Sequence, residues 1–216
     1  KDEKKKKVFY KFMDSSKIKM YGEQVGDKWI KGIEDYIPNE QYQTDEYVMG
    51  VISDIKKKWL IYSRGGKFHA IFATSSIPEA VQYWRLMKKE MPDLMITAMF
   101  DPTIDNEGGT GSLDKEDGIV EMLEDYKNRL GQSFTIPTYD KFRKDVSLRL
   151  AHKKPYDRLE PDQQIDILIV VNQMLTGFDS KWVNTLYLDK VMQYENLIQA
   201  FSRTNRLFNE SEKPFG

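Results

Sequence analysis

The chain has 216 residues, with 33 Lys and Arg against 34 Asp and Glu, so its net charge is close to zero. Hydrophobic residues make up 40% of it, which is typical of a folded protein, and the balanced charge excludes a uniformly basic nucleic-acid binder. The absence of cysteine excludes disulfides and thiol chemistry, and only two histidines are present, too few for a His-rich metal site. We therefore expect one large domain, with or without an appendage, in a reducing compartment.

The ends of the sequence suggest a piece of a longer protein, because the chain begins at Lys1 without a methionine. The lysine-rich start is not followed by the apolar core of a signal peptide, and no apolar run is long enough to span a membrane. We expect a cytoplasmic location without a membrane segment, and a parent chain with further domains.

Residues 1–60 are polar and predict helices with no strong strand. Within them, Val48, Ile52 and Ile55 recur at helical spacing. We expect this part to be a helical linker or appendage, followed by one domain over residues 61–216.

The rest of the chain alternates short apolar runs with amphipathic segments, which predicts an α/β fold with a parallel sheet and helices on both faces. Ligands of such sheets collect at the carboxyl ends of the strands, so the turns after Thr74, Phe100, Val171 and Leu188 are the places to search. The predicted strands cover 68–74, 94–100, 165–171 and 183–188, and the predicted helices begin at Ser76 or cover 118–130, 139–152 and 194–207.

Local signals refine the first half of this domain. Ser76 and Glu79 fit a capping box, and the helix that they open carries Trp84 and Met87 on one face. Residues 101–117 are rich in Gly, Asp and Asn, which predicts a mobile surface loop.

Two short motifs do not hold. Gly66 and Lys67 lack the earlier glycine and the following Ser or Thr of a phosphate loop, so the chain alone lacks the usual means of holding Mg-ATP. Asp162 with Asp179 and Lys181 imitates a magnesium nuclease signature, but its second half falls in a turn and not on a strand. A nuclease built on these residues would cut DNA without ATP, and it is kept only as a remote alternative.

The last predicted helix carries Gln199, Arg203 and Arg206, which fall within an arc of about 60°. Two guanidinium groups and an amide in register suit a phosphate oxyanion, and a solvated polar face is the alternative. Upstream, the most apolar strand leads into a Gly-x-Asp turn formed by Gly177 and Asp179.

This order of strand, Gly-x-Asp turn, short strand and Gln-x3-Arg-x2-Arg helix resembles motifs V and VI of superfamily 2 helicases and translocases. Residues 168–182 (LIVVNQMLTGFDSKW) and 193–206 (QYENLIQAFSRTNR) are similar to the R, or motor, subunit of type I restriction enzymes. The stretch 69–80 (HAIFATSSIPEA) is similar to the motif IV region of that family. Ser202 and Asn205 depart from the general superfamily pattern, in which glycine is common.

The resemblance implies the second RecA-like domain of an ATP-dependent DNA translocase, within a parent type I site-specific deoxyribonuclease. It implies an arginine finger at Arg206 on the γ-phosphate, a neighbouring sensor at Arg203, and a Gln199 that orients the arginines or the attacking water. Gly177 and Asp179 would border the nucleotide. ATP and Mg would be bound mainly by the first RecA-like domain, which this chain lacks, and no metal ligand is expected here.

By the same resemblance, double-stranded DNA would cross the tips of the strands, where short polar side chains suit phosphate contacts without sequence information. The implied partners are the first RecA-like and nuclease domains of the parent chain, together with the methyltransferase and specificity subunits of the complex. The DNA-contact candidates are Thr74, Ser75, Asn172, Gln173 and Thr176.

Two other functions stay open at this point. One is the RecA-like half of another superfamily 2 DNA helicase or remodelling translocase. The other is a non-catalytic α/β module that binds a phosphorylated ligand through the arginine pair.

Overall fold

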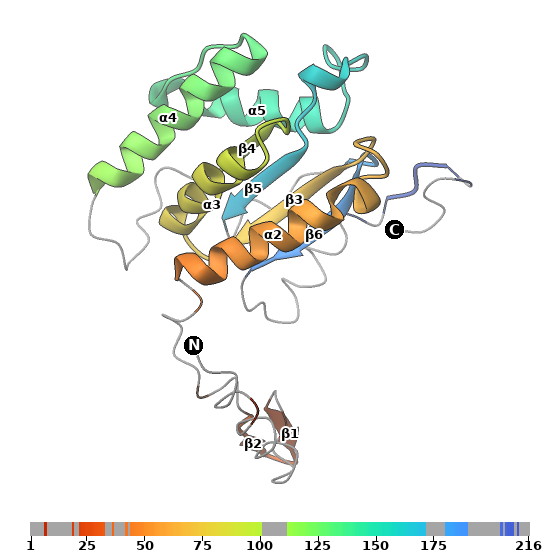
Figure 1. The fold of residues 1–216 in the computed structure, drawn as a ribbon. Helices are drawn as coiled ribbons and strands as arrows, with labels where there is room; N and C mark the ends of the chain where they lie inside the picture. The colour runs from red at the N-terminus through yellow and green to blue at the C-terminus, as the bar shows by residue number, and fades with distance from the viewer. Residues whose placement is uncertain are drawn as a thin grey trace. The chain divides into compact units, whose positions relative to one another are not determined.

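The computed structural model describes residues 7, 19, 22–32, 36, 42, 44–100, 112–171, 180–189, 204, 206–209 and 211 (Figure 1). The chain divides into two compact units, Lys1–Val48 and Met49–Gly216. The domain boundary expected near residue 60 stays a prediction. In the part of the chain that the structure describes, no helix combines the length and the apolar character needed to cross a membrane.

A small antiparallel hairpin, β1 (Glu23–Val25) and β2 (Lys28–Ile30), lies in the first unit. Its tight turn holds Gly26 at a φ of 59°, a conformation that glycine adopts without strain. The expectation of no strong strand before residue 60 is wrong here, because Gly26 and Asp27 supply hairpin turn chemistry inside a polar stretch.

Helix α2 (Asp45–Tyr62) confirms the helix expected from the apolar spacing. In the second unit it buries Ile52, Ile55 and Trp59 on one face. At its end, the side-chain amide of Asn184 donates a hydrogen bond to the carbonyl oxygen of Tyr62 at 2.7 Å, which ties the helix to the last strand of the sheet.

Four parallel strands form the central sheet in the order β4-β5-β3-β6. All residues of β3, β4 and β5 are buried, as continuous apolar runs between two helical layers require, whereas β6 is a partly exposed edge strand. This arrangement confirms the predicted α/β, RecA-like class and all four predicted strands. The bounds are β3 (His69–Thr74), β4 (Ile96–Met99), β5 (Ile167–Val171) and β6 (Val183–Leu188).

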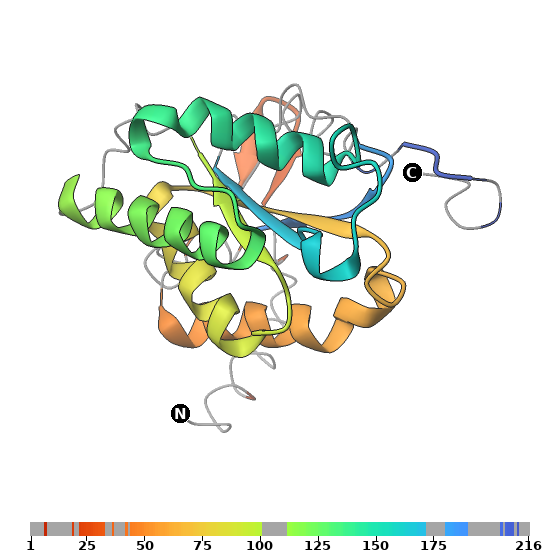
Figure 2. The ribbon, with the colours of Figure 1, turned by 90° about the horizontal axis from the view of Figure 1, so that it is seen from above.

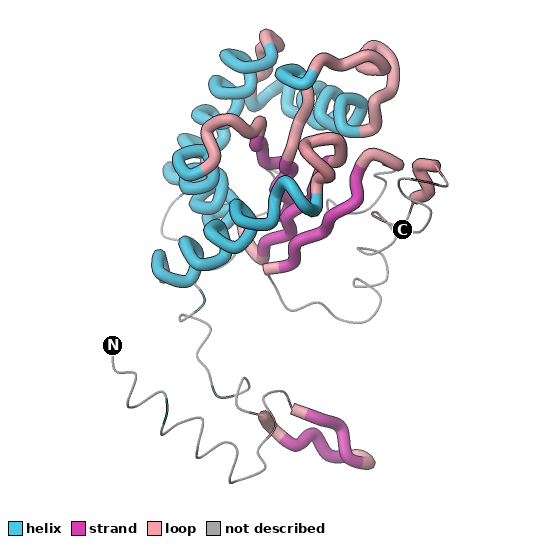
Figure 3. Tube along the Cα trace, turned by 45° about the vertical axis from the view of Figure 1, so that its right-hand side comes forward, coloured by secondary structure: helices cyan, strands magenta, loops and turns pink. Residues whose placement is uncertain are grey.

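Helices cover both faces of this sheet: α2 and α3 (Ile77–Glu90) lie on one face, and α5 (Tyr139–Leu150) lies on the other (Figure 2). The tube in Figure 3 shows the same layers, with the strands of the sheet side by side against the helices. Trp84 and Met87 are buried, as the helical spacing predicted. Short 3-10 turns, η3 (Ile136–Thr138) and η4 (Pro161–Gln163), lie on either side of α5 in the sequence.

Helix α4 (Ser112–Leu130) begins earlier than predicted. Residues 112–117 were expected in a mobile loop, but they form its first turns, since Ser112 and the acidic residues after it are favourable at a helix start. Residues 101–111 of the predicted loop lie outside the described residues.

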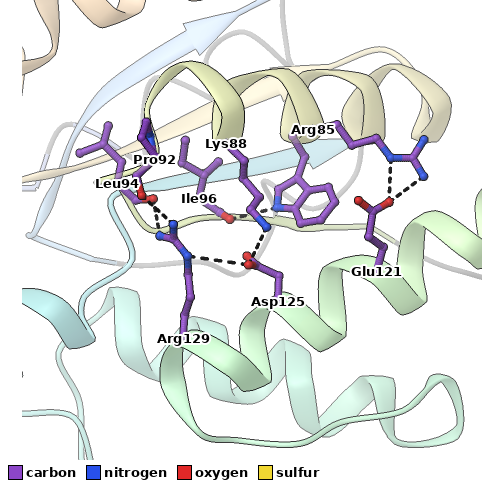
Figure 4. Close-up of polar contacts among 9 residues, drawn as sticks. Arg85, Lys88, Pro92, Leu94, Ile96, Glu121, Asp125 and Arg129 are labelled. Atoms are coloured by element: carbon purple, nitrogen blue, oxygen red, sulfur yellow. Dashed lines mark hydrogen bonds and ion pairs between the residues drawn. The ribbon is translucent and has the colours of Figure 1, made fainter.

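Polar contacts fasten α4 to α3 (Figure 4). Arg85 pairs with Glu121 at 2.7 Å, and the Lys88 ammonium pairs with Asp125 at 2.5 Å. The Arg129 guanidinium donates to the carbonyl oxygens of Pro92 and Leu94 at 2.6 and 2.7 Å. These contacts hold the turn between α3 and β4, and so fix where β4 starts. Gly118 of α4 packs against Val81 of α3. A Cβ at position 118 would come within 2.9 Å of the Val81 methyl groups, so the absence of a side chain lets the two helices approach closely.

A buried polar network holds α5. Arg149 is only 3% exposed, and its guanidinium donates to the Gln163 carbonyl at 2.8 Å and to the Gln132 side chain at 2.9 Å. The Asp145 carboxylate lies 3.8 Å from the Arg149 Nε and accepts hydrogen bonds from the hydroxyls of Tyr126 and Tyr156. Through these hydrogen bonds, the Arg149–Asp145 pair connects α5 with α4 and with the loop that leads to β5.

Candidate functional site

The carboxyl edge of the sheet begins at Thr74, the last residue of β3. Thr74 is buried, and its hydroxyl donates to the Val170 carbonyl at 3.3 Å. Ser75 is exposed, and its backbone N–H donates to the Glu79 carboxylate at 2.8 Å. The Ser76 hydroxyl accepts the Glu79 N–H at 3.4 Å, which confirms the N-cap half of the predicted capping box, whereas the Glu79 carboxylate reaches the N–H of Ser75 and not that of Ser76. The Ser75 side chain is thereby held at the surface of a rigid turn.

A second group at this edge was not predicted. Asp189 directly follows β6, its N–H donates to the Ala73 carbonyl at 3.0 Å, and its carboxylate accepts a hydrogen bond from the Tyr83 hydroxyl. The contact joins α3 to the chain that leaves β6. An acidic residue directly after an apolar strand was the available signal, because parallel strands end at a common edge.

Arg206 lies elsewhere in the fold. It is exposed and belongs to no helix, and neither does Leu207, so the helix predicted over 194–207 is wrong at these two positions. The helical register that was to align Arg206 with Gln199 therefore does not extend to Arg206. The reason lies two residues on, where Phe208 is held by the aromatic contacts described below.

Thr74 and Ser75 lie at the carboxyl edge, whereas Phe208, two residues after Arg206, contacts Phe68 and Trp182 at the opposite, amino edge. The nuclease alternative stays untested, because Asp179 lies outside the described residues. The other predicted site residues lie outside the described residues: Asn172, Gln173, Thr176, Gly177, Asp179, Gln199 and Arg203.

Four rings contact one another in a row at the amino edge of the sheet, and we call them the aromatic column: His69, His152, Trp182 and Phe208. The two imidazoles lie 5.0 Å apart, and the His152 ring stacks on the Trp182 ring at 4.1 Å with an angle of 13°. Phe208 meets Trp182 edge-on at 4.6 Å, and it meets Phe68 edge-on at 5.3 Å. Neither histidine entered the sequence-based site, because nothing local relates residues so distant along the chain.

Two ammonium groups complete the surroundings of Phe208. The Nζ atoms of Lys67 and Lys181 lie 5.1 and 5.2 Å from the centroid of its ring. An aromatic pair contributes about 0.5–1.5 kcal/mol, and a cation over a ring contributes about 0.5–1 kcal/mol at an exposed site. Ordering one backbone residue costs about 1–2 kcal/mol, so the contacts of this ring offset the ordering of about two or three residues.

The histidine pair is neutral in the folded protein. Burial, and then the nearby His152, lowers the pKa of His69 to about 3, and burial, and then Lys181, lowers the pKa of His152 to about 4. Their Nε2 atoms lie 2.7 Å apart, so one imidazole donates a hydrogen bond and the other accepts it. A neutral pair makes this bond possible, because two protonated rings would both be donors.

Because both histidines have lowered pKa values in the folded protein, we expect the protein to lose stability in acid. Unfolded imidazoles take up protons near pH 6.5, whereas the folded ones stay neutral to about pH 4, so the free energy of unfolding falls as the pH drops below 7. For His69, the loss between pH 7 and pH 5 is about 2 kcal/mol. His152 is partly exposed and adds less, and Asp166, whose pKa burial raises to about 6, acts in the opposite direction.

Urea unfolding at both pH values, with His69→Gln as the variant, tests this expectation. The variant should lose about 2 kcal/mol less than the wild type, since Asp166 and the other carboxyl groups are common to both. Equal losses would show that the imidazole of His69 is not buried as a neutral group.

Comparison with known families gives a match over most of the chain. Residues 66–216 match the family described as type I restriction enzyme subunit R domain 3. This range includes all four strands of the parallel sheet and both edges described above.

Curated relatives agree with this match. The chain is 38% identical over 161 residues to the endonuclease subunit of the type I restriction enzyme SauCOLORF180P of Staphylococcus aureus strain COL, which covers 72% of this chain and 17% of the relative. It is 35% identical over 197 residues to the endonuclease subunit of SsaAORF53P of Staphylococcus saprophyticus, which covers 88% of this chain and 20% of the relative. A shorter match, 42% over 57 residues, is to the HindI endonuclease subunit of Haemophilus influenzae, with 26% and 5% covered. The chain thus spans at most about a fifth of the length of these relatives.

Proposed function

Because the chain belongs to the R-subunit family of type I restriction enzymes, we propose that it is the second RecA-like domain of an ATP-dependent DNA translocase. The observation that carries the proposal is the family match over residues 66–216, which coincides with a RecA-like parallel sheet. The parent would be an ATP-dependent site-specific deoxyribonuclease in the bacterial or archaeal cytoplasm. A first RecA-like domain and a nuclease domain would lie elsewhere in the same parent chain, and methyltransferase and specificity subunits would complete the complex.

In this proposal, Mg-ATP binds between the two RecA-like domains, mainly on the first. Arg206 reaches the γ-phosphate as an arginine finger, with Arg203 as sensor and Gln199 orienting the arginines or the water. Gly177 and Asp179 border the nucleotide. The exposure of Arg206 supports this role, because a finger must reach a ligand held by another domain.

Duplex DNA would run across the carboxyl edge of the sheet. Ser75 is the best placed of the described candidates, since it is exposed on a turn that its backbone hydrogen bond to Glu79 holds in place. Thr74 would act indirectly, because its hydroxyl is already bonded to β5 and holds that turn in place. Asn172, Gln173 and Thr176 would add phosphate contacts, which position the protein without reading sequence.

ATP hydrolysis by the isolated 216-residue chain, compared with that of the full-length subunit in its complex, tests this function. The isolated chain carries only one side of the proposed interdomain ATP site, so it should give less than about a hundredth of the DNA-stimulated turnover of the complete enzyme. The phosphate loop and the acidic residues of the first RecA-like domain would lie elsewhere in the parent chain. DNA-stimulated turnover by the pure chain would contradict the half-motor. Tight ATP binding by the chain alone, without turnover, would favour the phosphate-binding module instead.

A further inference from the structure

The aromatic column connects the start of the sheet to the last described part of the chain. His69 is the first residue of β3, Trp182 precedes β6, and His152 follows α5. These three rings of the aromatic column therefore come from three separate parts of the domain. Phe208 is the member that comes from the C-terminal region, and it closes the stack against Trp182 and Phe68. The column is therefore a contact between the rigid sheet and the segment 206–209.

This segment carries Arg206. Two residues of chain span at most about 7 Å, so a fixed Phe208 confines the backbone of Arg206 to a small region beside the column. On the other side, Thr204 is only 9% exposed. The backbone of Arg206 is thus held between a buried residue and a clamped ring, while its own side chain is exposed.

The clamp is built from groups that the proposed reaction does not use. Lys67 and Lys181 approach the Phe208 ring, and Arg64 lies 5.8 Å from the centroid of Phe68. Among the described residues, the Nδ1 atom of the buried His69 finds no hydrogen-bond partner, although an unpaired buried nitrogen is costly. The His152 ring stacks on Trp182, so the histidine pair and Phe208 contact the same indole ring.

We propose that the aromatic column is a positioning anchor for Arg206, with Phe208 as the residue that links the column to the segment 206–209. The inference rests on the proposed function, since it explains how a guanidinium on an irregular segment enters the ATP site at a defined place. Phe208 is a positioning residue and touches no substrate. Its removal leaves the nucleotide contacts of the other residues intact and lets the segment 206–209 leave the sheet.

Phe208→Ala in the complete enzyme tests the anchor, with DNA-stimulated ATP hydrolysis as the readout. A misplaced finger weakens the transition state and not the ground state, so kcat should fall about tenfold or more while KM for ATP stays within about twofold. Phe208→Tyr keeps the ring and should restore kcat. Phe208→Leu keeps an apolar side chain without a ring, so it guards against a folding defect and should still be slow.

Phe134→Ala is the matched control. Phe134 is also a half-buried ring with aromatic neighbours, Tyr126 and Phe142, but it lies between α4 and η3, away from the column. Its truncation should lower the melting temperature and leave kcat unchanged. An equal loss of kcat in both variants, at equal folded fractions, would show that the effect of Phe208 is only structural and would overturn the anchor.

The double variant with Arg206→Ala separates the two hypotheses. An anchor that acts through Arg206 should add less than about a twofold loss once the guanidinium is gone, because its only target is missing. If Phe208→Ala lowers kcat by a further large factor in the Arg206→Ala background, the anchor hypothesis is wrong, while the arginine-finger hypothesis is unaffected. If Arg206→Ala alone leaves turnover unchanged, the proposed function fails, and the anchor fails with it.

Discussion

Arg149→Ala is expected to lower the free energy of unfolding by about 3–5 kcal/mol, because it leaves a buried carboxylate without its counter-charge. Arg149 is 3% exposed, and it donates to Gln163 and Gln132 in addition to facing Asp145. Truncation opens a cavity and removes the donors of these groups at once. The loss should appear in urea unfolding as a lower midpoint with an unchanged slope.

Arg85→Ala serves as the control for this expectation. Arg85 also bridges two elements through a carboxylate, but both partners are about half exposed, so its truncation should cost at most about 1 kcal/mol. The double variant Asp145→Asn with Arg149→Met removes both charges and should recover part of the loss. If the two single truncations cost the same, the network around α5 does not hold the domain together.

Much of the domain was predictable because its signals are local. A run such as Ile167–Val171 is apolar throughout, and only a strand covered on both faces suits it. The helix after β3 carries its own start signal in Ser76 and Glu79, and the structure has the Ser76 cap, with the Glu79 carboxylate bonded one residue earlier, to the Ser75 N–H. Local chemistry therefore located the strands and the turn that holds Ser75.

The remaining features depend on contacts between distant residues. His69 and His152 lie 83 positions apart, and no pattern in either neighbourhood indicates that they meet. The same holds for Phe208 and Trp182, whose contact accompanies an irregular backbone where helical periodicity predicted a continuing helix at Arg206. Periodicity describes which residues could share a helix face, but tertiary contacts decide where the helix ends.

The aromatic column also changes how the candidate site is understood. The sequence predicted DNA contacts at the carboxyl ends of the strands and placed Arg206 on the last predicted helix. The structure keeps Ser75 there, adds Asp189, and places Phe208, two residues after Arg206, against residues that precede β3 and β6. Under the proposed function, the DNA contact at Ser75 and the anchor of Arg206 would lie on opposite edges of one sheet, which would move both together when the interdomain cleft closes.

Arg206→Ala in the complete restriction enzyme is expected to reduce DNA-stimulated ATP hydrolysis by about a hundredfold or more, since arginine fingers contribute about 10³–10⁵ in rate. Arg206→Lys should remain slow, because an ammonium cannot reproduce the planar, forked donors of a guanidinium. Arg158→Ala, which truncates another exposed arginine, should leave turnover unchanged.

The most direct measurement of the account is therefore kcat for DNA-stimulated ATP hydrolysis by Arg206→Ala, taken with DNA and ATP affinities on the same folded protein. We predict a loss of about a hundredfold or more in kcat with both affinities within a few-fold of the wild type. Turnover within about threefold of the wild type would contradict the account, because Arg206 would then not act at the γ-phosphate.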